Sequence, residues 1–146
     1  MTEGWFLIDT SAWIWALRPD GVAAIRNRVS EVLAERRGAT TPLVLLELLG
    51  GARDEKSYGE LLEELSALQQ FSINEAVWTR SYRSAFDLKR HGVTVPATDV
   101  LIATVAQENR VTLLHADHHF DLMAAKTDLV VESWVKAASA QKRRKR

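Results

Sequence analysis

The sequence contains no cysteine, no long apolar run and no excess of either charge. Without cysteine, disulfides and thiolate metal sites are excluded, which fits a reducing compartment, and we expect a cytoplasmic protein. No apolar stretch approaches the roughly 20 residues that a membrane-spanning helix needs. No basic region precedes the short apolar run near the start, so no signal peptide is expected. The 146 residues, 47% of them apolar, are enough for one globular domain.

The overall charge balance hides an uneven distribution. The chain has 19 basic and 19 acidic residues, but residues 142–146 are all basic, so the rest of the chain is acidic. We expect residues 1–138 to form a single domain and residues 139–146 to form a basic, disordered tail. Such a tail can bind a phosphate backbone through counterion release, or it can be only a solvated end of the chain.

Apolar runs and turn signals alternate along the chain. The first run, Trp5–Ile8, has no polar interruption, which is typical of a strand buried on both faces. Strands that alternate with helices predict a three-layer α/β/α domain with a parallel sheet. The predicted strands are 5–8, 39–41, 71–73, 111–114 and 128–131, and the predicted helices are 11–17, 22–37, 42–49, 58–69, 75–90, 99–106 and 118–123.

Four acidic residues occupy positions where such a fold binds ligands. Asp9 and Asp117 each follow an apolar strand, and parallel α/β sheets bind ligands at the carboxyl ends of their strands. Glu47 interrupts an apolar helix predicted to be largely buried, where an unpaired carboxylate is costly. Asp99 lies in the first turn of another helix. Three of these acids also have a simpler explanation: Asp9 and Asp99 suit helix starts, and Glu47 could lie on a narrow exposed stripe.

Together, the four carboxylates predict a site for a hard cation. Carboxylate oxygens are preferred ligands of Mg²⁺, which keeps several waters and also binds substrate phosphates. A bound cation offsets the mutual repulsion of the acids, lowers the pKa of a water molecule and stabilises displacement at phosphorus. The pattern therefore indicates metal-dependent hydrolysis of phosphodiesters.

Four motifs in series resemble those of PIN-domain ribonucleases, most closely the VapC-type toxins of bacterial toxin–antitoxin pairs. The resemblance covers nearly the whole chain, in the family's order. The motifs are Leu7-Ile8-Asp9-Thr10-Ser11-Ala12-Trp13, Leu46-Glu47-Leu48-Leu49-Gly50-Gly51-Ala52-Arg53, Asp99-Val100-Leu101-Ile102-Ala103-Thr104-Val105-Ala106 and Leu113-Leu114-His115-Ala116-Asp117-His118-His119-Phe120.

This resemblance implies a sheet of about five parallel strands, Mg²⁺ or Mn²⁺ at the acids, endonucleolytic cleavage of RNA, a homodimer and a cognate antitoxin. It makes Asp9, Glu47, Asp99 and Asp117 the acidic site, with Asp9 and Asp99 as the firmest metal ligands. Thr10 or Ser11 is expected to orient a carboxylate or to contact a phosphate. The chain departs from the family at Ala116, where a hydroxyl residue often precedes the fourth acid.

Other side chains near these motifs have two interpretations each. His115, His118 and His119 crowd Asp117, and imidazole nitrogens would suit a transition metal such as zinc, although oxygen ligands favour Mg²⁺ or Mn²⁺ and a structural or solvated role is the default. Trp13 and Trp15 are expected in the core, with a dimer or antitoxin interface as the alternative.

The sequence leaves the activity and its substrate partly open. The main alternative is a PIN-like binding or regulatory module that binds metal weakly without catalysis. A metal-dependent phosphatase or DNA nuclease would use the same site on another substrate. Because the chain without its basic tail is net negative, RNA would have to bind at a local basic patch. The candidates for this patch are Arg53, Arg80, Arg83, Lys89 and the basic tail.

Overall fold

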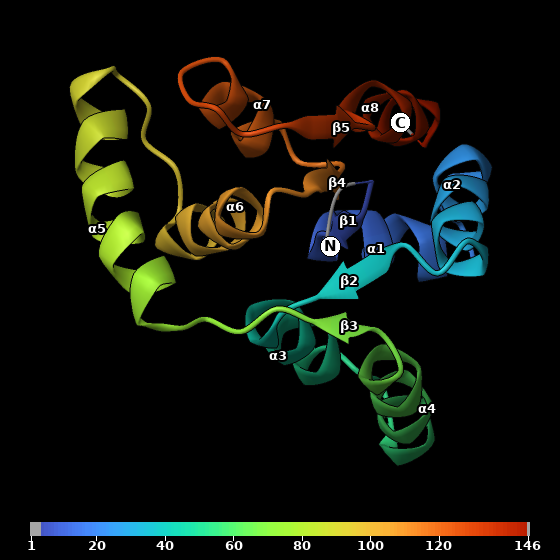
Figure 1. Ribbon diagram of the computed structural model, residues 1–146. Coiled ribbons are helices and arrows are strands. Elements are labelled where there is room, and N and C mark those ends of the chain that lie inside the picture. Colours follow the sequence, from blue (N-terminus) through green and yellow to red (C-terminus); the bar gives the residue numbers. More distant parts are fainter. Residues whose placement is uncertain (1–3, 146) are drawn as a thin grey trace.

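The computed structural model describes residues 4–145 and contains a five-stranded parallel sheet in the order β3-β2-β1-β4-β5 (Figure 1). Buried β1 is central, and Leu7 is in register with Ala39 on one side and with Leu113 on the other. The predicted parallel α/β architecture is therefore confirmed. The strands are β1 (Phe6–Ile8), β2 (Gly38–Thr40), β3 (Gln69–Gln70), β4 (Thr112–His115) and β5 (Val131–Ser133).

Helices cover the sheet on both sides. In Figure 1, α5, α6 and α7 lie on one side, whereas α2 and α4 lie on the other. Residues 100–106 of α6 are all buried, because their small and branched side chains let this helix pack against the centre of the domain. The helices are α1 (Thr10–Leu17), α2 (Ala23–Ala34), α3 (Pro42–Gly50), α4 (Glu55–Ser66), α5 (Glu75–Arg90), α6 (Ala97–Asn109), α7 (His118–Ala124) and α8 (Val135–Arg144).

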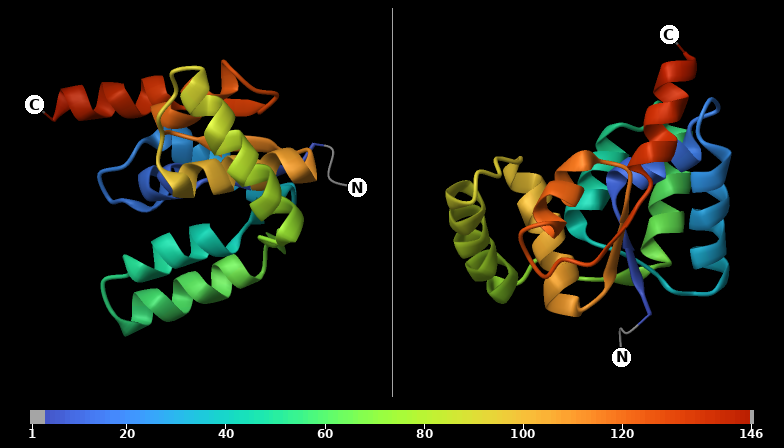
Figure 2. Two further views of the ribbon diagram at one scale, coloured as in Figure 1. Left: turned by 90° about the vertical axis from the view of Figure 1, so that its left-hand side faces the viewer. Right: turned by 90° about the horizontal axis from the view of Figure 1, so that it is seen from above.

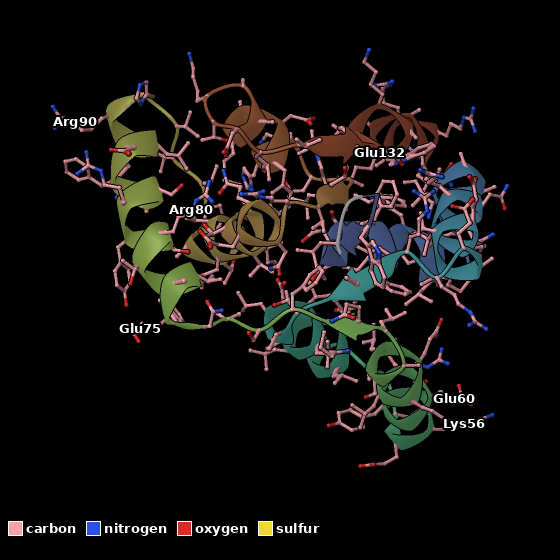
Figure 3. All side chains as sticks on the ribbon, viewed as in Figure 1. Lys56, Glu60, Glu75, Arg80, Arg90 and Glu132 are labelled. Carbon is pink, nitrogen blue, oxygen red and sulfur yellow. The ribbon has the colours of Figure 1, made fainter. Side chains whose placement is uncertain are left out.

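Charged side chains connect the layers at two places. Arg80 of α5 reaches Glu108 of α6 at 3.2 Å, and its side chain lies between the two helices in Figure 3. Arg28 of α2 pairs with Glu132 of β5 at 2.9 Å. The two predicted core tryptophans, Trp13 and Trp15, are both buried, which confirms the default interpretation for them. No helix among residues 4–145 is both long and apolar enough to cross a membrane.

Three local expectations differ from the structure. β3 precedes the predicted strand at 71–73, and β5 begins at the last residue of the one predicted at 128–131. Helix α4 starts at Glu55 instead of Tyr58, because the Asp54 side chain accepts a hydrogen bond from the backbone N–H of Ser57 and caps the helix there. Most of the expected tail is helical, since α8 continues to Arg144.

Helix α3 is much more exposed than its apolar sequence predicts. Of its residues only Val44 and Leu48 are buried, and Leu46 is 69% exposed. The reason is its position: α3 and α4 form a helix pair set apart from the rest of the domain, as the left view of Figure 2 shows, so no layer covers the outer face of α3. The prediction that this helix is largely buried was therefore wrong, and Glu47 lies on an exposed part of the helix.

Candidate active site

Strand order brings the first and fourth motifs together. β1 and β4 are parallel neighbours, so the residues that follow them, Asp9 and Asp117, leave the sheet at the same edge. Each acid also caps the helix that follows it, because Asp9 accepts from the N–H of Ser11 and Asp117 accepts from the N–H of His119. The capping interpretation and the site interpretation of these two residues are thus compatible.

Asp9 is the most deeply buried carboxylate of the group. Its side chain is 4% exposed, and one oxygen accepts hydrogen bonds from the N–H of Ser11 at 2.9 Å and from the Ser11 hydroxyl at 2.6 Å. The pKa of Asp9 is raised to about 7. Burial is the main cause, the hydrogen bonds from Ser11 oppose it, and the negative charges of Asp99 and Glu47 act in the same direction as burial. No ion pair within residues 4–145 involves Asp9, so this part of the chain gives its carboxylate no compensating positive charge.

The two hydroxyl residues after Asp9 serve two different carboxylates. Thr10 donates from Oγ1 to Oε1 of Glu47 at 2.8 Å and so ties α1 to α3. Ser11 donates to Asp9 and accepts, at 2.9 Å, a hydrogen bond from the backbone N–H of Ala116. The missing hydroxyl at position 116 is therefore not needed to connect the fourth motif to the first. Both hydroxyls thus contact carboxylates in this structure.

Asp99 and Asp117 are joined by a histidine. Nδ1 of His119 lies 2.9 Å from Oδ2 of Asp99 and 3.3 Å from Oδ1 of Asp117. Burial raises the pKa of Asp99, the hydrogen bond from His119 opposes that shift, and the charges of Asp117 and Glu47 add to it. The charge of Asp99 raises the pKa of Asp9, that of Asp117 raises the pKa of Asp99, and that of Glu47 raises both, so the four predicted acids are electrostatically linked.

The three histidines of the fourth motif differ in role. His115 is fully buried, its Nδ1 accepts from the N–H of Asp117, and its Nε2 lies 3.2 Å from Asp121. Burial lowers the pKa of His115, so a neutral, structural imidazole fits this position. His118 and His119 instead face Asp117, and one ligand atom from each of these three residues lies within 4.8 Å of the others. The contact between His119 and Asp99 spans 20 residues, so no local sequence pattern indicates it.

The residues of this site fit a divalent cation. A buried carboxylate with a raised pKa stands beside three further acids, and a cation would remove the electrostatic cost of that arrangement. The oxygen-rich donor set matches Mg²⁺ or Mn²⁺. His118 and His119 add nitrogen atoms at one side, and these would favour Mn²⁺ or another transition metal over Mg²⁺.

Ser11 offers a test of carboxylate positioning. We expect Ser11→Ala to lower the activity of the site by about 10- to 100-fold, the usual effect of losing a hydrogen-bond partner of a metal ligand. The backbone N–H of Ala116 would lose its acceptor at the same time. The measurement is the rate of phosphodiester cleavage at saturating Mg²⁺ or Mn²⁺. Ser30→Ala, on the exposed face of α2, is the control. Equal rates for both variants would show that the Ser11 hydroxyl does not position Asp9.

Comparison with known proteins places these observations in context. A family model described as PIN domain matches residues 6–126. The "VapC ribonuclease Mb1587" of Mycobacterium bovis is 33% identical over 136 residues, which cover 88% of this chain and 98% of that protein. "Ribonuclease VapC18" of Mycobacterium tuberculosis is 29% identical over 134 residues, with 89% and 94% covered.

Solved structures show the same fold at lower identity. VapBC2 from Rickettsia felis, bound to a DNA fragment from its promoter, matches with a TM-score of 0.74 and 22% identity, covering 88% of this chain and 98% of the matched one. DNA-bound VapBC from Salmonella typhimurium also has a TM-score of 0.74, with 21% identity and 89% and 98% covered.

Proposed function

This chain belongs to the PIN domain family, and we propose that it is an endoribonuclease that depends on Mg²⁺ or Mn²⁺ and acts as the toxin of a toxin–antitoxin pair. The ribonuclease activity follows from the family and from relatives named as VapC ribonucleases over most of their length. The observation that carries the proposed metal dependence is the buried carboxylate of Asp9, whose pKa is raised by burial and by the negative charges of Asp99 and Glu47.

Asp9, Glu47, Asp99 and Asp117 are the residues that would hold the metal. When bound, a divalent cation lowers the pKa of a water molecule and offsets the negative charge that develops on the phosphate. The chain's own groups prepare the site for it. Ser11 donates a hydrogen bond to Asp9, Thr10 donates one to Glu47, and Nδ1 of His119 lies 2.9 Å from Asp99 and 3.3 Å from Asp117.

Water is the expected nucleophile in this mechanism. Attack by water on phosphorus breaks the bond to the 3′ oxygen of the preceding nucleotide, which leaves as a hydroxyl after taking up a proton. The products are a 5′-phosphate and a 3′-hydroxyl, and the 2′-hydroxyl of the RNA stays intact. An enzyme that used the 2′-hydroxyl as nucleophile would instead need a general base and acid around the ribose.

The proposed partners follow from the family as well. Several structural neighbours are titled as VapBC complexes or as toxin–antitoxin complexes, so we infer a cognate antitoxin for this chain. A homodimer is proposed from the resemblance to the family's toxins. The exposed apolar side chains of the α3–α4 pair, such as Leu46 and Leu62, are consistent with the need for a protein partner.

Metal dependence is tested with purified protein free of antitoxin. We expect it to cut a structured RNA pool in Mg²⁺ or Mn²⁺ and to lose all cleavage in EDTA, with activity restored when the cation is added back. Single-stranded DNA and a simple phosphomonoester serve as comparison substrates. Undiminished cleavage in EDTA would contradict the proposed role of the cation. Faster cleavage of DNA than of RNA would contradict the proposal that RNA is the substrate.

A further inference from the structure

A groove of about 570 Å³ runs from the acidic site along α1 and α8. Asp117 and His119 line one end of it, and Trp15 and Arg18 of α1 form part of its wall. The opposite wall is α8, whose residues Val135, Ala138, Ser139 and Lys142 line the groove. These four positions follow the spacing of a single helical face, so α8 presents one side to the groove and its other side to solvent. We call this feature the α1–α8 groove.

Contacts with the turn between α1 and α2 fix α8 in place. The Gln141 amide donates to the backbone oxygen of Asp20 at 3.1 Å, and Lys145 pairs with the Asp20 carboxylate. Ala138 of α8 is buried against the domain. Figure 2 shows α8 extending out of the domain beside this turn. The groove is therefore a fixed feature, although the sequence alone predicted a disordered tail at 139–146.

Among the described residues of α8, Lys142 is the one basic residue that lines the groove. Its side chain is exposed, and none of the ion pairs of residues 4–145 involves it. The other basic candidates do not line this groove: Arg80 pairs with Glu108 and Asp128, Arg83 with Asp87 and Arg53 with Asp54, whereas Lys89 takes part in none of the ion pairs of residues 4–145. Lys142 thus offers a free positive charge in the same groove as Asp117.

The charges of the groove match those of a nucleic-acid backbone. Four carboxylates repel a polyanion, and a divalent cation would offset that repulsion only at the phosphate it contacts. A neighbouring phosphate therefore needs a positively charged side chain, and Lys142 offers one in the groove that Asp117 also lines. Arg18 at the rim lies over the Trp15 ring at 4.9 Å and is paired with Asp20, so Lys142 is the groove cation that no acid neutralises among residues 4–145.

We propose that the α1–α8 groove binds the sugar-phosphate backbone of the substrate RNA next to the scissile phosphate, with Lys142 as the phosphate contact. This inference rests on the proposed ribonuclease function, because the RNA it binds is the substrate of the acidic site. It assigns a substrate-binding role to a helix that lies beyond the stretch matched by the family model, residues 6–126. Arg143 and Arg144 lie off the groove face and contribute only a general positive field.

The test compares two lysines of the same helix. Lys142→Gln removes the groove charge, and Lys136→Gln removes an exposed charge of the same type from another face of α8. Binding of a fluorescent single-stranded RNA is measured by anisotropy with Mg²⁺ present, in the Asp99→Asn background so that the probe is not cut. We expect Lys142→Gln to raise Kd roughly tenfold, as the loss of one charged hydrogen bond does, and Lys136→Gln to leave it nearly unchanged.

Salt dependence adds a second, independent measure. Each phosphate contact on a single strand contributes about 0.7 to the slope of log K against log salt, so Lys142→Gln is expected to reduce the slope by about that amount. In the active protein the same change is expected to raise KM and to leave kcat nearly unaltered. Ser139→Trp, which fills the groove, is expected to weaken RNA binding without changing Mn²⁺ binding.

The outcomes separate this proposal from the proposed activity. Equal losses in Lys142→Gln and Lys136→Gln would mean that α8 acts through net charge alone, and an unchanged Kd in Lys142→Gln would leave the groove to a protein partner. Either result overturns the proposal even if the wild type cleaves RNA. Conversely, RNA binding that depends on Lys142 in a protein that never cleaves would support the groove and contradict the ribonuclease.

Discussion

Replacing Asp99 with asparagine is expected to abolish RNA cleavage while the fold stays intact. Asparagine has nearly the same shape as aspartate and keeps an oxygen for the hydrogen bond with His119, so the start of α6 should be preserved. What is lost is a negative charge that would help to hold the proposed cation. We expect the rate to fall by more than about 100-fold, since even the loss of a residue that only supports a metal ligand costs up to that much.

A matched control is available on the same helix. Glu108→Gln removes a charge near the other end of α6, where Glu108 pairs with Arg80 on the surface. This variant should cleave like the wild type and lose at most about 1 kcal/mol of stability. Rates are compared under single-turnover conditions, with circular dichroism to verify folding. If folded Asp99→Asn cleaved as fast as Glu108→Gln, Asp99 would have no part in catalysis.

Asp9→Asn is expected to make the metal-free protein more stable and at the same time inactive. The pKa of Asp9 is raised from 3.8 to about 7 because the carboxylate is buried. Three pKa units at about 1.36 kcal/mol each correspond to a penalty on the order of 4 kcal/mol when the group is charged. Asparagine carries no charge and can still accept the hydrogen bonds of Ser11.

The sign of this effect fixes its pH dependence. A carboxyl group with a higher pKa in the folded state binds its proton more tightly there, so the free energy of unfolding of the wild type falls as pH rises from about 4 to about 7 and is constant above that range. Chemical denaturation in EDTA at pH 4 and at pH 8 measures this free energy of unfolding. The variant should gain stability over the wild type only at pH 8, and saturating Mn²⁺ should stabilise only the wild type. A variant less stable than the wild type at pH 8 would show that Asp9 is not an uncompensated charge.

The sequence was sufficient to predict the architecture, and it pointed to four acids whose role at the site stays a prediction. An uninterrupted apolar strand that ends in a carboxylate marks the edge of a parallel sheet, and this pattern occurs twice, at Asp9 and at Asp117. The long helix α5 was predicted with its bounds, Glu75–Arg90, because Asn74 caps it and an amphipathic pattern runs through four turns. Long periodic segments carry this information, and strands of two to four residues do not.

What sequence could not predict are contacts between residues far apart in the chain. Thr10 meets Glu47 across 37 residues, and Ser11 meets Ala116 across 105. The exposure of α3 escaped prediction for a similar reason, since an apolar helix reads as buried whether or not another layer covers it. The α1–α8 groove likewise depends on how the last helix packs against the first, which no local pattern records.

The most direct test of the central claim is the chemistry of the cut ends. A single-stranded RNA is cleaved by the wild type in Mg²⁺, and the products are analysed for their terminal groups, with EDTA and Asp99→Asn as parallel reactions. Hydrolysis at the acidic site predicts 5′-phosphate and 3′-hydroxyl ends that form only when the cation and Asp99 are both present. Ends carrying a 2′,3′-cyclic phosphate, or cuts that persist in EDTA, would contradict the account.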